Sequence, residues 1–318
     1  MLDADARARL LARHGAAAEP WLDALPARLA PLAARWRIAL DRTAAPLVGR
    51  TSVVVPGERD GAPVMVKLAL DPRDAAAEAS ALRAWGTATV PAPADAEGGS
   101  PLACAAGAPP VPRLLATDAQ AGALLLEAIV PGTALRANRA APSVDACAAL
   151  LLALRAPLPP PWLPSLSERV EWVFALWSER RASEPRARAA VPAARLERGR
   201  DAARELAADR AAPRALVQGD LHLGNVLDGG PARGLVAIDP RPCVGDPLFD
   251  AVELVLHGPP SVAAARERAA LLAARTGDDR DRVIAWCAAL AALDAAAAAV
   301  RAPAPPRDQI EVLLALAA

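Results

Sequence analysis

The sequence predicts an α+β fold in two lobes, a small β-rich N-lobe followed by a larger helical C-lobe. Three observations predict this fold. Short apolar runs separated by turn residues fill much of the first 130 residues. Helical periodicity then dominates from about residue 141 onward. A Pro-Gly pair at 131–132 separates the two regimes, and 318 residues suffice for two lobes. We expect an N-lobe over 1–127, a hinge over 128–132 and a C-lobe over 133–318.

The N-lobe is expected to begin with helices and to continue as a sheet of four or five strands. Pro26 and Pro31 must break or kink the second helix, because proline lacks the N–H that a helix interior needs. Turn residues at 57–61 separate the first two strands, and Asp71-Pro72 is a typical helix start. We predict helices over 3–15, 20–41 and 71–85, and strands over 47–55, 63–69, 111–116 and 123–130.

Residues 87–110 are rich in Pro, Ala and Gly and have no periodicity, which indicates a surface loop or a disordered insertion in the N-lobe. The C-lobe is expected to be helical, with three short strands that interrupt the helices. We predict helices over 143–155, 166–184, 192–210, 248–257, 261–275, 280–300 and 306–317, and strands over 215–218, 225–228 and 234–238.

Composition excludes several classes of protein. The 36 basic and 36 acidic residues balance, so nothing favours nucleic acid or a membrane as a partner. The first residues lack the apolar core of a signal peptide, and the four cysteines form no C-x-x-C pair, so we expect a cytoplasmic protein with reduced thiols. The most apolar stretch, 283–300, contains Asp294 and predicts a buried helix. We expect a monomer or a weak homodimer.

The most informative segment is 218–225 (QGDLHLGN), which is followed by IDP at 238–240. Asp220 precedes Asn225 by five positions, the spacing of the protein-kinase catalytic loop, in which an Asp accepts the hydroxyl proton and an Asn holds Mg²⁺. Asp239 follows fourteen positions later, which suits a short hairpin that returns with a second metal-binding residue. The segment therefore predicts an ATP-dependent phosphotransferase with Asp220 as base, Asn225 and Asp239 as Mg²⁺ ligands, and a metal-binding strand over 234–240.

Lys67 is the single lysine among the 36 basic residues, and it ends an apolar, strand-like run. This position resembles the kinase strand that carries the phosphate-binding lysine, although coding bias toward arginine is an alternative explanation. Glu78 shares one face of the next helix with Leu82 and Trp85, so we expect it to point inward and pair with Lys67. A solvent-exposed glutamate is the alternative.

His222 raises a rival hypothesis, because Gly-Asp-x-His also opens a dinuclear metallophosphatase motif. That site needs further histidines, and the chain has only His14 and His257 besides. We therefore expect His222 to organise the catalytic loop through hydrogen bonds. Asp246 is expected to brace that loop or to cap the following helix.

Acidic residues near the predicted base suggest the acceptor. Asp250 and Glu253 follow the metal-binding strand and are candidates to contact the substrate. With Asp246, Glu168 and Glu171 they would form a carboxylate wall that attracts a cationic ligand. The alternative is that these acids pair with nearby arginines. No G-x-G-x-x-G loop is present; the segment 47–52 stands in its place, and Ser52 is a candidate nucleotide contact.

These motifs resemble the aminoglycoside phosphotransferase superfamily, and most closely its aminoglycoside/hydroxyurea resistance kinases. The similar parts are GDLHLGN at 219–225, the ID…GDPLFD segment at 238–250, the hairpin that ends at Lys67, and the segment 124–132. The resemblance covers most of 20–255 and implies a protein-kinase-like fold, ATP and Mg²⁺ as cofactors, and nucleotide contacts from Glu127 and Ile129 in the hinge region. Gln218 departs from the histidine that this group usually has there.

The resemblance implies transfer of the γ-phosphoryl group of ATP to a hydroxyl group of a small molecule. A streptomycin-like antibiotic is the first candidate acceptor, and a metabolite such as a sugar or amino alcohol is the second. A nucleotide-binding pseudoenzyme is a third hypothesis. It is disfavoured because Lys67, Asp220, Asn225 and Asp239 are all present.

Overall fold

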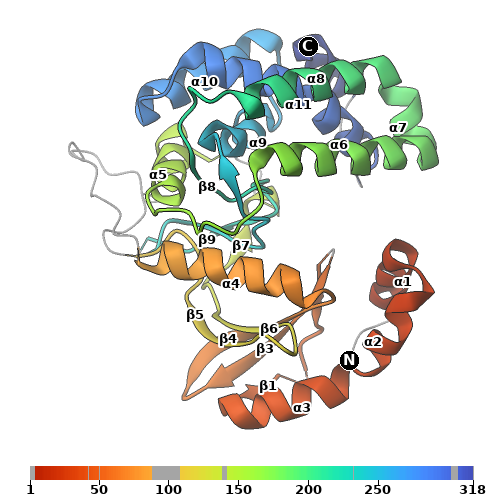
Figure 1. The fold of residues 1–318 in the computed structure, drawn as a ribbon, viewed down its shortest axis with the longest axis vertical. Coiled ribbons are helices and arrows are strands. Elements are labelled where there is room, and N and C mark those ends of the chain that lie inside the picture. Colours follow the sequence, from red (N-terminus) through yellow and green to blue (C-terminus); the bar gives the residue numbers. More distant parts are fainter. Residues whose placement is uncertain are drawn as a thin grey trace. The chain divides into compact units, whose positions relative to one another are not determined.

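The computed structural model describes residues 4–41, 43–49, 51–87, 108–137, 142–231, 233–301 and 307–317. The chain divides into two compact units (Figure 1), Met1–Gly86 with Val111–Val130 and Thr87–Pro110 with Pro131–Ala318. We call these the N-unit and the C-unit. The division at Val130 falls within the predicted hinge. Most of the predicted insertion 87–110 lies outside the described residues, and its described end, 108–110, groups with the C-unit and not with the N-unit.

The N-unit contains a six-stranded antiparallel sheet. Its order is β1-β3-β4-β6-β5, with β2 on the other part of β3. The predicted strand 47–55 is interrupted, because residues 47–48 fold back onto 53–54 through a turn at Gly49. The observed turn is shorter than the predicted turn 57–61 and consists of Asp60 and Gly61. Both residues have a positive φ, as a tight hairpin requires. The strands are β1 (Ala39–Leu40), β2 (Leu47–Val48), β3 (Ser52–Arg59), β4 (Ala62–Ala69), β5 (Leu114–Asp118) and β6 (Ala123–Glu127).

The leading helices of the N-unit cover one face of this sheet. The predicted helix 20–41 is broken at Ala24, where Pro26 opens a new helix, and it ends at Arg37, which has a left-handed φ of 55°. Alternate residues of β3, β4 and β6 pack against apolar side chains of these helices, as the two-residue period of strands requires. The helices are α1 (Ala4–His14), η1 (Ala16–Ala18), α2 (Glu19–Asp23) and α3 (Leu25–Trp36).

Helix α4 (Pro72–Thr87) lies along the face of the sheet opposite to α3 (Figure 1). Val66 and Leu68 of β4 are fully buried in the core beneath α3. Lys67, between them, must therefore project toward α4. The alternation of β4 thus places the single lysine on the face that α4 covers.

The C-unit is mostly helical, with short strands paired in twos and threes. Strand β8 pairs with β11, and β9 lies between β7 and β10. The predicted helix 248–257 begins as a 3₁₀ turn, and α7, β7 and β11 were not predicted. The helices are α5 (Val144–Arg155), α6 (Leu166–Ser183), α7 (Pro185–Ala190), α8 (Ala193–Ala208), α9 (Val252–Leu256), α10 (Val262–Thr276), α11 (Arg280–Ala299) and α12 (Arg307–Leu316), with 3₁₀ turns η2 (Leu135–Ala137) and η3 (Pro247–Ala251). The strands are β7 (Thr133–Ala134), β8 (Ala215–Val217), β9 (Val226–Asp228), β10 (Leu235–Ala237) and β11 (Cys243–Gly245).

Helix α11 is the core of the C-unit and contacts α6, α7, α8, α9, α10 and α12. In the described part of the chain it is the one helix long and apolar enough to cross a membrane, but 67% of its most apolar window is buried inside the unit. Burial of this kind is typical of a core helix. Close approach to α8 depends on Gly199, where a Cβ would lie 2.5 Å from the Ala289 carbonyl oxygen.

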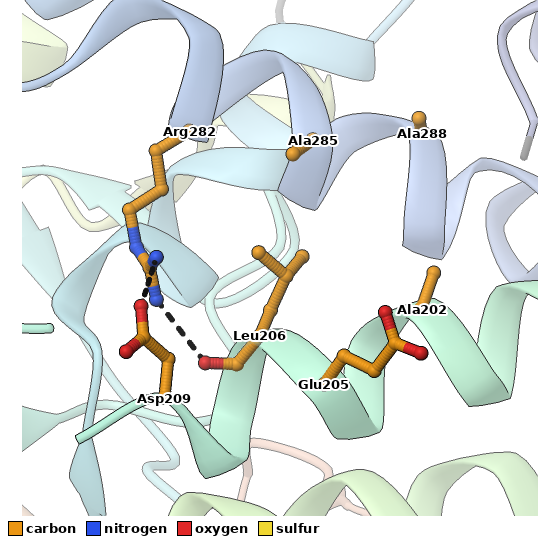
Figure 2. Close-up of a pocket in the computed structure, with 7 residues that line it drawn as sticks. All are labelled: Ala202, Glu205, Leu206, Asp209, Arg282, Ala285 and Ala288. Carbon is orange, nitrogen blue, oxygen red and sulfur yellow. Dashed lines mark hydrogen bonds and ion pairs between the residues drawn. The ribbon is translucent and has the colours of Figure 1, made fainter. Parts of the chain in front are cut away.

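A groove of about 500 Å³ runs between α8 and α11 (Figure 2). Alanines form much of its lining, and Arg282 at one end is held by Asp209 and by the Leu206 carbonyl oxygen. None of the predicted site residues lines this groove, which results from packing small side chains between two helices. Its lining residues are Ala202, Glu205, Leu206, Asp209, Arg282, Ala285 and Ala288.

Candidate active site

The catalytic loop 218–225 connects β8 to β9 in the C-unit, and a second loop follows β10. Backbone hydrogen bonds join the two loops. The Arg241 N–H donates to the Gln218 carbonyl oxygen at 2.8 Å, and the Ile238 N–H donates to the Asn225 carbonyl oxygen at 2.8 Å. Because Asn225 is opposite Ile238, Asp239 lies at the adjacent position. The fold therefore brings together the residues predicted from the Asp-Asn-Asp spacing.

Gly219 is required where the loops cross. Its φ of 78° is left-handed, and a Cβ there would lie 2.1 Å from the Arg241 carbonyl oxygen. Asp239 also has a positive φ, 49°, which is uncommon for a residue with a side chain. Backbone strain of this kind is characteristic of sites whose side chains must be held in one direction.

Gln218 connects the two loops through its side chain. Its amide nitrogen, Nε2, donates to the Ile238 carbonyl oxygen at 2.8 Å, and its Oε1 accepts from the Asp220 N–H at 2.7 Å. The side chain is fully buried. A primary amide supplies both a donor and an acceptor. Gln218, the residue that departs from the family pattern, therefore forms one hydrogen bond with each of the two loops.

Asp250 was predicted to contact the substrate, and the structure corrects this. Its carboxylate accepts the Gln218 N–H at 2.6 Å and the Gly219 N–H at 2.9 Å. Only 4% of the residue is exposed. Burial raises the pKa of Asp250 to about 7, and the two N–H bonds oppose that shift by favouring the ionised form. Asp250 therefore braces the catalytic loop from η3.

The Asp220 side chain is one-quarter exposed and is held at Oδ1, whereas Oδ2 has only a long contact. Oδ1 accepts from Arg169 Nη2 at 3.1 Å, and Oδ2 lies 3.5 Å from Asn225 Nδ2, which also donates to the Asp220 carbonyl oxygen at 3.0 Å. His222 forms two hydrogen bonds within the loop: its Nδ1 accepts the Gly224 N–H at 3.0 Å, and its carbonyl oxygen accepts the Asn225 N–H at 2.7 Å.

Asn225 and Asp239 offer an amide and a carboxylate at neighbouring positions of two joined loops. Oxygen donors of this type suit Mg²⁺, which takes few protein ligands and keeps waters and phosphate oxygens in its remaining positions. Within the described residues no group of three or more His, Cys, Asp or Glu side chains forms a metal site. A donor pair fits Mg²⁺ delivered with a nucleotide and does not fit a fully protein-ligated ion such as structural zinc.

In the N-unit, Lys67 Nζ and Glu78 Oε2 are 2.6 Å apart. The two side chains are only 6% and 7% exposed. Strand β4 supplies the lysine, and Glu78 is buried on the inner face of α4 together with Leu82 and Trp85. A solvent-exposed role for Glu78 is therefore excluded, and the ammonium group is held by a desolvated partner.

The other nucleotide candidates also lie in the N-unit. Ser52 begins β3 and is 2% exposed. The Glu127 carboxylate accepts the Arg113 N–H at 3.2 Å at the end of β6, and Ile129 is half-buried just beyond it. The Glu127 side chain thus has a structural partner, which its position in the sequence did not indicate.

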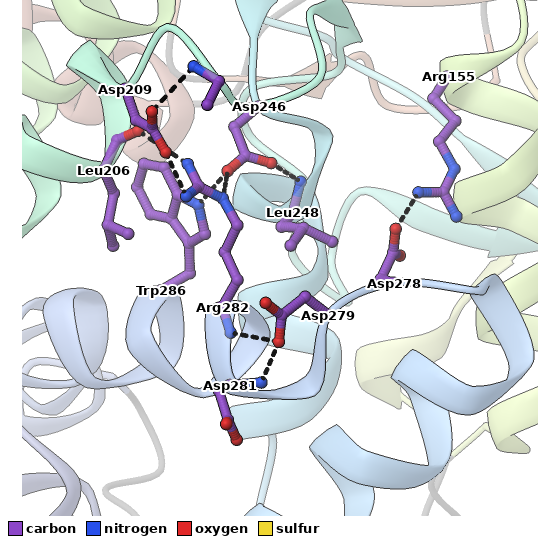
Figure 3. Close-up of polar contacts among 11 residues, drawn as sticks. Arg155, Leu206, Asp209, Asp246, Leu248, Asp278, Asp279, Asp281, Arg282 and Trp286 are labelled. Atoms are coloured by element: carbon purple, nitrogen blue, oxygen red, sulfur yellow. Dashed lines mark hydrogen bonds and ion pairs between the residues drawn. The ribbon is translucent and has the colours of Figure 1, made fainter.

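Asp246 caps η3 and ties it to α11 (Figure 3). Its Oδ1 accepts the Leu248 N–H at 3.0 Å, and its Oδ2 accepts Arg282 Nε at 2.6 Å and Trp286 Nε1 at 2.7 Å. Of the two roles predicted for Asp246, the structure shows the helix cap. The loop brace is supplied by Asp250.

The expected wall of five acids is also corrected. Glu168 closes a capping box with Ser165 at the start of α6. Glu171 pairs with Arg204 and Arg200, whose hydrogen bonds lower its pKa to about 2. With Asp246 and Asp250 engaged elsewhere, Glu253 is the one member of this set left to face a ligand.

A second carboxylate joins Glu253. Asp294, from the middle of α11, is 9% exposed, and in the described residues neither carboxylate has a hydrogen-bond or ion-pair partner. Burial raises the pKa of Asp294 to about 7, and burial together with Asp294 raises the pKa of Glu253. Arg136, Arg301 and Asp220 lie within electrostatic range, and we call these five residues the charged cluster.

Arg136 connects this cluster to the catalytic loop. Its N–H donates to the Leu223 carbonyl oxygen at 3.0 Å, and its guanidinium carbon lies 3.2 Å from where a Cβ on Gly224 would be. Spacing in the sequence could not reveal Arg136 or Arg169, which lie fifty or more residues from their partners. For Asp294 the sequence did contain a signal of a functional role, because it is an acid within the alanine-rich apolar stretch 283–300.

Comparison with known proteins supplies the family. The family model for aminoglycoside/hydroxyurea antibiotic resistance kinases matches residues 35–301. The chain belongs to this family. The kinase is 33% identical over 279 residues to a hydroxyurea phosphotransferase of Kitasatospora aureofaciens. The matched region covers 86% of the chain and 72% of that protein. It is 30% identical over 284 residues to a streptomycin 6-kinase of Streptomyces glaucescens, covering 86% of the chain and 82% of that protein.

Solved structures show the same fold. A choline/ethanolamine kinase family protein of Mesorhizobium loti matches with a TM-score of 0.55 and 17% identity, covering 92% of the chain and 93% of that protein. The predicted protein-kinase-like fold is therefore confirmed, with a β-sheet N-lobe and a mostly helical remainder. Family membership also shows that the kinase is a phosphotransferase that acts on hydroxyl groups.

Proposed function

We propose that the kinase transfers the γ-phosphoryl group of ATP to a hydroxyl group of a small cationic antibiotic of the streptomycin type, and so inactivates it in the cytoplasm. The observation that carries the choice of acceptor is the pair of unpartnered carboxylates, Glu253 and Asp294, of which Glu253 lies in electrostatic range of Asp220. Similarity to a streptomycin 6-kinase supports the same choice.

Asp220 would accept the proton of the acceptor hydroxyl as that oxygen attacks phosphorus. Asn225 and Asp239 would hold Mg²⁺, which when bound neutralises charge on the phosphate oxygens. Lys67, oriented by Glu78, would contact the nucleotide phosphates. Each role rests on the resemblance to the kinase catalytic loop together with the contacts described above.

The acceptor argument is electrostatic. A buried carboxylate without a partner is costly, and it is stabilised when a ligand supplies a cationic hydrogen-bond donor. Glu253 and Asp294 lie on neighbouring helices and have no such donor in the described residues. An ammonium or guanidinium group on the acceptor would satisfy both and would hold the molecule close to Asp220.

A second acceptor class is favoured by Arg136 and Arg301. These two guanidinium groups offset the two carboxylates, so the charged cluster without Asp220 is formally neutral. A small neutral molecule with both donors and acceptors, such as hydroxyurea, suits such a cluster, and a relative of the kinase is a hydroxyurea phosphotransferase.

ATP consumption by the purified kinase with Mg²⁺ tests the proposal. Streptomycin, hydroxyurea, a neutral sugar and an amino alcohol would be compared, and phosphorylated products identified by mass. We expect turnover with streptomycin and a KM that rises with salt while kcat changes little, because exposed charges are screened within about 8–10 Å at physiological ionic strength. Efficient phosphorylation of neutral acceptors alone would overturn the cationic class.

Two variants test the residues. Asp294→Asn should raise the KM for a cationic acceptor by roughly tenfold, the scale of one charge-assisted hydrogen bond, and should leave a neutral acceptor unaffected. Asp145→Asn is the matched control, because Asp145 is an exposed acid that pairs with Arg275 on the surface. Equal effects of both variants would show that only net charge matters.

Asp220→Asn should lower kcat by roughly 10²–10⁴, the usual contribution of general acid–base catalysis, with nucleotide affinity nearly unchanged. Turnover within a few-fold of the wild type would remove Asp220 from the role of base. Asp239→Ala should abolish turnover and weaken Mg²⁺-dependent nucleotide binding, which equilibrium titration with and without Mg²⁺ would measure.

A further inference from the structure

Arg169 makes the closest contacts to the predicted base from outside the catalytic loop. Its Nε donates to the Gly219 carbonyl oxygen at 2.7 Å, and its Nη2 donates to Asp220 Oδ1 at 3.1 Å. The residue is only 8% exposed. One guanidinium group thus binds the backbone before Asp220 and the carboxylate itself.

Helix α6 presents Arg169 rigidly. The capping box of Ser165 and Glu168 fixes the start of the helix. Ser165 is also bridged to Val244 of β11, and the Val244 N–H donates to the Pro164 carbonyl oxygen at 2.9 Å. Because β11 pairs with β8, which leads into the catalytic loop, the start of α6 and the loop are held by the same pair of strands.

Trp172 completes the arrangement. Its ring lies one turn along α6 and stacks on the Arg169 guanidinium carbon at 4.6 Å, although the residue is 47% exposed. A large aromatic side chain kept at the surface loses hydrophobic burial, and here it covers the face of the guanidinium group that bonds to Gly219 and Asp220. The planar group is therefore restrained by its ring contact and by both hydrogen bonds.

We propose that Arg169, held by Trp172, is a positioning residue that fixes the Asp220 carboxylate by binding Oδ1, so that Oδ2 is the oxygen that accepts the acceptor proton. Oδ2 lies 3.5 Å from Asn225 Nδ2, a weak contact that leaves it able to accept a hydrogen bond. This inference rests on the proposed role of Asp220 as the base. It predicts that Arg169 acts on kcat only through Asp220.

A double-mutant cycle on kcat tests the proposal. Arg169→Gln should lower kcat roughly 10–100-fold, with both KM values changed less than about threefold. In the Asp220→Asn background the same substitution should have no further effect, because the carboxylate it positions is absent. Arg169→Lys should restore little, since an ammonium group cannot span both acceptors while stacking on a ring.

Arg180→Gln is the matched control. Arg180 stacks on Trp177 of the same helix at 4.9 Å, so its removal repeats the loss of an arginine–tryptophan pair. We expect kcat within about twofold of the wild type. Equal losses from Arg180→Gln and Arg169→Gln, or additive losses with Asp220→Asn, would show that Arg169 only supports the fold and would overturn the proposal.

Trp172 keeps the test valid if Arg169→Gln fails to fold. The ring is half exposed, so Trp172→Leu should fold, and it should lower kcat by roughly 3–10-fold, with recovery in Trp172→Phe. Unchanged kcat in Trp172→Leu would remove the tryptophan from the proposal. If the wild type phosphorylates no acceptor at all, the proposed function fails; if the wild type is active and the cycle is additive, the Arg169 inference alone fails.

Discussion

At the scale of single residues, Lys67 and Glu78 form the most deeply buried ion pair in the described residues of the N-unit. Their side chains are only 6% and 7% exposed, and 2.6 Å separates Nζ from Oε2, so both charges lie in a desolvated environment. Loss of one partner of a buried pair typically costs about 3–5 kcal/mol, whereas replacing both with apolar groups costs far less. The nucleotide-binding role proposed for the pair rests on the family resemblance, and the burial of both charges allows their coupling to be measured by mutation.

We therefore predict strong coupling between Lys67→Met and Glu78→Leu. The double variant should be more stable than the sum of the single variants by roughly 2 kcal/mol or more, in free energies of unfolding from urea titrations. Arg275 and Asp145, 60% and 57% exposed, are the control pair, for which coupling should stay below about 1 kcal/mol. Additive losses at Lys67 and Glu78 would contradict the buried-pair interpretation.

Residues whose roles are encoded in short spacing could be predicted from the sequence. Asp220, Asn225 and Asp239 were predicted in this way, and the loops do bring them together. Asp250 could not be assigned, because its partners are backbone N–H groups 31 and 32 residues away and carry no side-chain signature. Arg169 was missed for the same reason, since 51 residues separate it from Asp220.

At the scale of elements, the contact between α8 and α11 depends on a missing side chain. A Cβ on Gly199 would lie 2.5 Å from the Ala289 carbonyl oxygen, an atom of the backbone that cannot turn aside. Gly86, in α4, has nothing within 4 Å of the same position. Alanine substitutions at the two positions therefore distinguish the cost of steric crowding, at Gly199, from the gain in helix propensity, at Gly86.

We predict that Gly199→Ala lowers the free energy of unfolding by roughly 1–3 kcal/mol through overpacking. Gly86→Ala should leave it unchanged or raise it by about 0.5–1 kcal/mol, because alanine loses less backbone entropy in a helix. Thermal and urea unfolding of both variants would measure this. A stabilised Gly199→Ala variant would mean that the two helices can separate without loss.

Most long helices of the C-unit were predicted within two residues of their ends, because their caps and apolar faces are local signals. Ser165 and Asp279, for example, cap α6 and α11 through hydrogen bonds to the first turn. Strands β7 and β11 were missed because two or three residues are too few to show a period. They are specified by their partners β9 and β8, which no local pattern reveals.

At the scale of the whole molecule, buried acids make stability depend on pH. Burial raises the pKa of Asp294 to about 7, and burial together with Asp294 raises that of Glu253. Between about pH 4 and 7 the folded chain therefore binds more protons than the unfolded chain, so these two groups stabilise the fold at low pH and lose that contribution as pH rises. His257 opposes them: burial and nearby arginines lower its pKa to about 4, which favours the folded state as pH rises to about 6.5.

Asp294→Asn should isolate the acidic contribution. Between pH 5 and pH 8 the free energy of unfolding should fall by roughly 1–3 kcal/mol less in the variant than in the wild type. The variant lacks a carboxylate that must ionise while buried, and Glu253 no longer has a charged neighbour. Urea unfolding at both pH values, with Asp145→Asn as control, measures the difference. Parallel pH profiles for the wild type and Asp294→Asn would contradict the raised pKa.

The segment 246–253 of the C-unit contains two acids that hold the structure together and one acid that does not. Asp246 and Asp250 hold η3 to α11 and to the catalytic loop, whereas Glu253, less than one helical turn after Asp250, has no partner among the described residues. Substitution at 253 or at Asp294 therefore breaks no contact that holds Gln218 or the loop. We expect selection for a new acceptor to accumulate changes at 253 and 294 while 246 and 250 stay constant, so that one phosphotransfer scaffold can acquire new substrates by a few tolerated mutations.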